Sequence, residues 1–116
     1  MTVDNLQAQI RKGILEYCIL LILSKDEASY ASSIIAELKN AQMIVVEGTL
    51  YPLLTRLKNQ GLLKYRWVES TQGPPRKYYS LTDRGIAVLN EWDYSWRDMV
   101  ASINHIREQA KNREPL

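Results

Sequence analysis

The sequence predicts a mainly α-helical fold with one small antiparallel β-hairpin. Apolar residues recur at helical spacing in four segments of the chain, and two short strand-like segments flank Gln72-Gly-Pro-Pro-Arg76. The chain has 116 residues, of which 46% are hydrophobic, so one domain with its own core and an appended helix is expected. We expect residues 1–81 to form that domain and residues 82–116 to form the appended helix.

The first helix is expected over residues 6–24. Apolar side chains recur there at spacings of three and four, at Leu6, Ile10, Ile14, Cys18 and Leu21. Its second half is apolar nearly all round, which is typical of a buried central helix. A second helix is expected over residues 29–40. The apolar residues 41–46 that follow it predict a short strand able to join the hairpin.

The third helix carries a core-facing stripe of four leucines, namely Leu50, Leu53, Leu54 and Leu57. At about 100° per residue the opposite face presents hydrogen-bonding and methyl-bearing groups with one cation. These outward residues are Thr49, Tyr51, Pro52, Thr55, Arg56 and Asn59. Pro52 is admissible only near the helix start, where it would have no intrahelical acceptor. Such a face can touch base edges and phosphates, although a simple solvated face is the alternative.

Two strands are expected at residues 62–68 and 77–81, joined by a turn that is stiffened by two prolines. Arg76 and Lys77 stand at the tip of this hairpin, where they could meet a DNA backbone. Residues 47–79 carry six Lys/Arg against two Asp/Glu, a net of +4, whereas the whole chain carries only +2. Positive charge gathered on the helix and hairpin is the footprint of a nucleic-acid binder, or an ordinary fluctuation of surface charge.

The last helix should begin after Thr82, a good N-cap residue followed by Asp83. Its apolar residues alternate at spacings of three and four, which is a heptad seam. A helix this long has little of its own domain to pack on, so a second copy of the chain is the expected partner; folding back on its own domain is the alternative. The expected dimer contacts include the first helix and are Leu6, Ile10, Leu89, Trp92, Trp96, Met99, Ile103 and Ile106.

A helix with one polar face that leads into a basic hairpin is the layout of a winged helix-turn-helix. Within this segment the residues Gly48-Thr-Leu-Tyr-Pro52, Gly61-Leu-Leu63 and Arg76-Lys-Tyr-Tyr79, followed by Leu81-Thr82 and Gly85, resemble the signature of the PadR family of bacterial transcriptional regulators. The resemblance implies a homodimeric regulator, most often a repressor, that binds double-stranded DNA at a pseudo-palindromic operator. One departure is Tyr30-Ala-Ser-Ser-Ile34, where many members read Tyr-Gly-Tyr followed by an acidic residue and Ile.

The single C-terminal helix resembles the smaller branch of that family. Some members bind flat hydrophobic or phenolic compounds at the dimer interface against a tryptophan, and Trp96 occupies the corresponding position here. The resemblance therefore implies an aromatic or hydrophobic effector held by Trp96 and its neighbour Trp92. The alternative is that both tryptophans only fill the seam.

Other function classes find little support in the sequence. The single histidine, His105, has no Cys cluster or matched carboxylates around it, so neither catalysis nor a metal or cofactor is expected. No apolar run reaches the ~20 residues that span a bilayer, and no secretion signal opens the chain, so a soluble cytoplasmic protein is expected. A winged helix used for protein–protein contact, without a DNA role, remains the alternative function.

Overall fold

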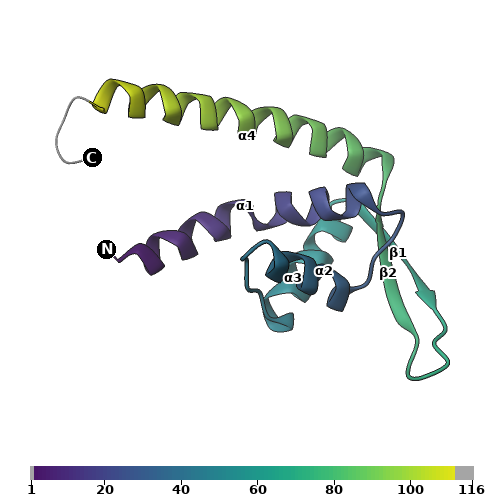
Figure 1. Ribbon diagram of the computed structural model, residues 1–116. Coiled ribbons are helices and arrows are strands. Elements are labelled where there is room, and N and C mark those ends of the chain that lie inside the picture. The colour runs from purple at the N-terminus through teal and green to yellow at the C-terminus, as the bar shows by residue number, and fades with distance from the viewer. Residues whose placement is uncertain (1, 112–116) are drawn as a thin grey trace.

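The structure is a computed structural model that describes residues 2–111 (Figure 1). Its elements run α1 Val3–Lys25, α2 Ala31–Asn40, α3 Glu47–Asn59, β1 Leu63–Val68, β2 Arg76–Leu81 and α4 Asp83–Ala110. The mainly helical fold with one hairpin is confirmed. Of the segment 82–116 assigned to the appended helix, residues 112–116 lie outside the described residues. Among residues 2–111, no helix is both long and apolar enough to cross a bilayer.

The second half of α1 is the centre of the core. Figure 1 shows it between α4 on one side and the pair α2 and α3 on the other. Ile19 and Leu20 of α1 are fully buried, as are Ile34 of α2 and Leu54 of α3. The nearly continuous apolar run of α1 therefore has a packing partner on several sides, whereas its first turns extend beyond the core and are exposed.

The start of α4 is fixed by close backbone contacts with the end of α3. Gly61, just past the C-cap of α3, has a φ of +79°, which favours glycine. The Thr82 hydroxyl accepts from the Gly85 amide at 2.9 Å and donates to the Gly61 carbonyl at 2.6 Å. A Cβ on Gly85 would lie 2.1 Å from the carbonyl oxygen of Leu62. Only glycine therefore allows α4 to start at this position, and the predicted N-cap at Thr82 is confirmed.

β1 and β2 pair antiparallel, from Leu63 opposite Leu81 to Val68 opposite Arg76. The strand expected at residues 41–46 is wrong, because these residues form a turn and an irregular connection. Gln42 has a φ of 67°. Val45 is buried in the core and Met43 packs against it, whereas Ile44 and Val46 are exposed. The backbone bridge to the hairpin comes instead from Ser29, which exchanges hydrogen bonds of 2.9 and 2.8 Å with Tyr79.

The two halves of the long α4 differ in their packing: the first half folds back on its own domain, and the second half is exposed. Its first half packs on α1, where the Tyr17 hydroxyl donates to the Asp93 carboxylate at 2.5 Å and the ring centroid lies 6.2 Å from that of Trp96. In its second half Met99 and Ile106 are 54% and 65% exposed. Figure 1 shows α4 running back along α1 in the opposite direction, with the two helices diverging toward the start of α1.

Candidate nucleic-acid interface and adjoining cavity

The outer face of α3 is the first candidate site. Leu50, Leu54 and Leu57 are completely buried and Leu53 is half-buried, which fixes the rotation of the helix. All six side chains expected on the opposite face are exposed, namely Thr49, Tyr51, Pro52, Thr55, Arg56 and Asn59. The structure therefore places the predicted residues together on one accessible helix face.

Pro52 lies further into α3 than expected. The helix begins at Glu47, so Pro52 is its sixth residue and lies inside the helix, not in its first turn. A proline there removes the hydrogen bond that the carbonyl of Gly48 would otherwise accept. The expectation that Pro52 is admissible only near the helix start is corrected accordingly, although its exposed side chain agrees with the predicted face.

A shallow hollow of about 610 Å³ occupies this face. Five of the six predicted residues line it, together with one residue that the sequence reasoning missed: Tyr51, Pro52, Thr55, Arg56, Asn59 and Gln60. Gln60 is the C-cap of α3, and its position one residue beyond Asn59 on the polar side was the signal available for it. The hollow offers amide, hydroxyl, aromatic and guanidinium groups within one concave surface.

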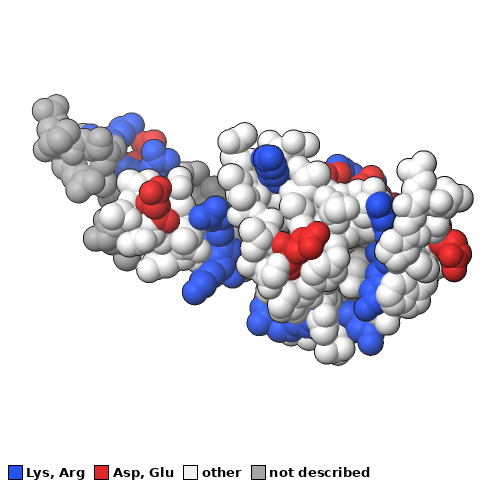
Figure 2. All heavy atoms as spheres, turned by 90° about the horizontal axis from the view of Figure 1, so that it is seen from below, with Lys and Arg blue, Asp and Glu red and all other residues white. Residues whose placement is uncertain are grey.

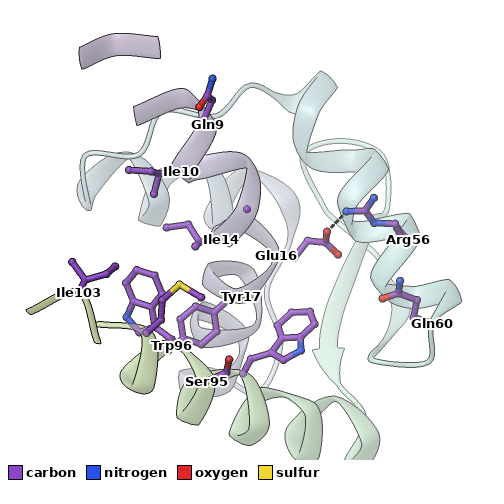
Figure 3. A pocket seen from close by; sticks show the side chains of 13 residues that line it. Gln9, Ile10, Ile14, Glu16, Tyr17, Arg56, Gln60, Ser95, Trp96 and Ile103 are labelled. Atoms are coloured by element: carbon purple, nitrogen blue, oxygen red, sulfur yellow. Dashed lines mark hydrogen bonds and ion pairs between the residues drawn. The ribbon is translucent and has the colours of Figure 1, made fainter. Parts of the chain in front are cut away.

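Arg56 is not free on this surface, because it is paired with α1. Its guanidinium donates to the carboxylate of Glu16, and the two side chains are 56% and 20% exposed (Figure 3). Glu16 interrupts the apolar run of α1, and this interruption was the sequence signal for a specific partner. The pair links α3, the helix expected to contact the bases of DNA and called the reading helix below, to α1, the central helix of the core.

The hairpin holds its two predicted cations against aromatic rings. The Arg76 guanidinium lies 4.6 Å from the ring centroid of Tyr30, and the Lys77 ammonium lies 4.4 Å from that of Tyr65 and 5.3 Å from that of Trp67. Figure 2 shows the molecule from the side of α2, α3 and the hairpin, with Lys and Arg along the inner side of the hairpin. Arg76 and Lys77 share a groove with Glu47 and Tyr51 of α3, so the cations lie next to the start of that helix.

A cavity of about 890 Å³ separates the diverging parts of α1 and α4 and reaches α3 (Figure 3). Trp92 and Trp96, the two predicted effector contacts, both line it, and the Tyr17 ring stands beside Trp96. Glu16 and Arg56 close its end at α3. The cavity is therefore mainly aromatic and aliphatic with one ion pair at one end, a composition typical of small-molecule sites.

Tyr17 lines this cavity and was missed by the sequence reasoning, which treated its segment as core. Burial, followed by the hydrogen bond to Asp93, raises the pKa of Tyr17 to about 12. Its hydroxyl therefore stays protonated at neutral pH and acts as a donor. Asp93 also pairs with Arg97 at 2.9 Å, so a short polar network joins α1 to α4 beside the cavity.

The residues predicted for dimer contact fall into three groups. Five are exposed to between 47% and 65%, on the first half of α1 and the second half of α4: Leu6, Ile10, Met99, Ile103 and Ile106. Trp92 and Trp96 are half-buried along the cavity. Leu89 is only 7% exposed and belongs to the core, so it has almost no surface to offer a second chain.

Comparison with known proteins agrees with this architecture. The model of the transcriptional regulator PadR-like family matches residues 19–91. A PadR-like transcription factor from Bacteroides fragilis is 63% identical, with a TM-score of 0.75, over 89% of this chain and 99% of that one. A PadR family transcriptional regulator from Eggerthella lenta is 33% identical, with a TM-score of 0.79, over 91% and 92%. PadR of Bacillus subtilis, solved in complex with operator DNA, is 27% identical, with a TM-score of 0.62, over 68% and 45%.

Proposed function

The chain belongs to the PadR-like family of transcriptional regulators, and from that membership we propose that it is a homodimeric repressor of the cytoplasm, released from DNA by a small aromatic or hydrophobic effector. The family is one of transcription regulators and not of enzymes. In this proposal residues 1–81 form the DNA-binding unit and residues 82–116 the dimerisation helix.

The observation that carries the DNA role is the hollow on the outer face of α3. A helix fits the major groove of B-DNA, where Asn and Gln can bond adenine edges, Arg can bond guanine, and methyl groups can contact thymine. Asn59, Gln60, Arg56 and Thr55 supply these groups. The relative from Bacillus subtilis was solved on operator DNA, which supports a DNA target for this chain as well.

The proposed dimer rests on the uncovered apolar surface of α1 and α4. Ile10 is 48% exposed and Ile103 is 49% exposed, and both line the cavity between the two helices. Burial stabilises by about 25 cal/mol per Å² of apolar surface, which favours covering these faces with a second copy. A symmetric dimer would present two α3 helices to successive major grooves, ~34 Å apart, on a pseudo-palindromic operator.

The proposed effector site is the cavity beside Trp92 and Trp96. Its volume of about 890 Å³ is large enough for a drug-sized aromatic molecule. The cavity touches α1, α3 and α4 at once, so an occupant that favours a different angle between α1 and α4 changes the spacing of the two reading helices. Such a ligand shifts the equilibrium only by the difference between its affinities for the two arrangements.

Fluorescence anisotropy tests the DNA role. The purified protein is titrated into labelled DNA from immediately upstream of its own gene and into a scrambled duplex, at two salt concentrations. We expect tight, sequence-selective binding that weakens with salt, by roughly 0.9 log units per log unit of salt for each phosphate neutralised. If the affinities for the two duplexes were equal and did not change with salt, the proposal would be contradicted and a winged helix that contacts another protein would be favoured.

A further inference from the structure

A second concave surface lies next to the reading face, between the starts of α2 and α3 and the tip of the hairpin. This groove has a volume of about 530 Å³, and its lining includes Tyr30, Tyr51, Trp67, Arg76 and Lys77 together with one carboxylate, Glu47. Tyr51 also lines the hollow on α3, so the groove continues the reading face towards the hairpin.

Each of the two cations in the groove rests on an aromatic ring. Arg76 lies 4.6 Å from the ring centroid of Tyr30, and the Lys77 ammonium contacts both the ring of Tyr65 and the ring of Trp67. Long cationic side chains lose considerable rotamer freedom when they bind a ligand, and a ring that already fixes them reduces that loss. The rings therefore keep the two charges in place before any ligand arrives.

The rings are in turn held by the body of the domain. The ring of Tyr30 lies 5.1 Å from that of Tyr78, and the ring of Tyr65 lies 5.8 Å from that of Tyr79. Tyr79 is only 4% exposed and is bridged through its backbone to Ser29. Aromatic pairs at these separations prefer such tilted arrangements, which defines the positions of the Tyr30 and Tyr65 rings. The ring of Trp67 stands edge-on to that of Tyr65, with 6.2 Å between their centroids.

The charge of the groove indicates which kind of ligand it binds. It combines two cations with one carboxylate, Glu47, and the first turn of α2 that borders it carries no acidic side chain. The N-terminal end of a helix favours negative charge. An elongated anion that also runs past Tyr51 along α3 fits this arrangement, and duplex DNA next to a reading helix presents such an anion as its phosphate backbone.

We propose that Tyr30, Tyr65 and Trp67 are positioning residues that hold Arg76 and Lys77 where the hairpin meets the DNA backbone. The inference rests on the proposed function and adds to it a role for aromatic side chains that would not contact the bases. It also gives Trp67, a tryptophan that is 61% exposed on β1, a reason to stand on the surface.

The test is a mutant cycle on Tyr30 and Arg76, read by binding to a mixed-sequence duplex of about 30 base pairs at low salt. Phosphate contacts do not depend on sequence, so this duplex reports them without an identified operator. We expect Tyr30→Phe, which keeps the ring, to bind like the unmodified protein. Tyr30→Leu should bind roughly two- to five-fold more weakly, the range expected for an exposed cation–π contact. In the Arg76→Ala background, Tyr30→Leu should have no further effect.

Thermal melts of each variant, with binding measured well below the melting temperature, exclude loss of fold as the cause. Equal binding by the Phe and Leu variants would overturn the inference, as would a Leu effect that persists undiminished without Arg76. If the unmodified protein binds no duplex at all, the proposed function fails and the inference fails with it. Binding by the unmodified protein together with additive effects of the two changes would overturn only the positioning role.

Discussion

The ion pair between Glu16 and Arg56 gives the sharpest prediction, because the Glu16 carboxylate and the proposed DNA ligand would compete for the same Arg56 guanidinium. In the proposed complex Arg56 must turn from the Glu16 carboxylate towards a base or a phosphate. Arg56 is 56% exposed, and exposed pairs of this kind contribute about 0.2–1 kcal/mol. Glu16→Gln should therefore free Arg56 and tighten DNA binding by roughly 1.4- to 5-fold.

Anisotropy titrations with the mixed-sequence duplex measure this change. Glu91→Gln is the matched control, because Glu91 is an exposed residue of α4 whose replacement alters the net charge equally. Arg56→Ala should weaken binding, and adding Glu16→Gln to it should then change little. The reasoning would be refuted if Glu16→Gln bound no more tightly than Glu91→Gln, or if its effect survived in the Arg56→Ala background.

Four further predictions concern the dimer, the cavity, the fold and its pH dependence. Met99→Asp places a charge on the exposed seam of α4, so a sizing column should show a monomer; a surviving dimer would exclude this seam. Trp96→Ala should weaken the binding of a planar aromatic dye, measured by quenching of the fluorescence of the remaining tryptophans, and an unchanged dye affinity would favour a packing role only. Gly85→Ala should lower the melting temperature, since its Cβ would overlap a backbone oxygen at a cost of about 1–3 kcal/mol or more. The pKa of Tyr17 is about 12 in the folded protein against 10.0 when unfolded, so the stability that Tyr17 contributes is fully present below pH 10 and is lost between pH 10 and 12. The melting temperature should therefore fall over this pH range, and the part of the fall that is due to Tyr17 should be absent in Tyr17→Phe.

Local patterns were enough to predict the elements that fix the reading face. The leucine stripe of α3 follows from helix periodicity, and the start of α4 follows from the capping chemistry of Thr82. The strand expected at residues 41–46 failed because periodicity cannot distinguish an extended strand from a turn that places a single residue, Val45, in the core. Local pattern thus predicted element type well and the role of a short apolar stretch poorly.

Contacts between distant residues could not be predicted in the same way. Arg76 and Tyr30 meet because the hairpin folds against the start of α2, and Arg56 of α3 and Glu16 of α1 meet although 40 residues separate them in the sequence. Each partner alone is compatible with an ordinary solvated position. The packing of the first half of α4 on α1 likewise depends on Tyr17, which lies on α1 and bonds Asp93 of α4. The spacing of apolar residues within α4 carries no information about such a partner.

The candidate effector cavity and the DNA-facing surface of α3 share residues, so an effector in the cavity could change DNA binding through direct contact. Arg56 and Gln60 line both the cavity and the hollow on α3, while Trp96 stands on the opposite wall of the cavity. An occupant that rests on Trp96 and displaces Arg56 would alter the reading face directly, without a long chain of intermediates. Coupling of this kind is reciprocal: an effector that lowers DNA affinity by a given factor must itself be bound more weakly by the DNA complex, by the same factor. An effector that leaves both the ion pair and the angle between α1 and α4 unchanged would bind without releasing DNA.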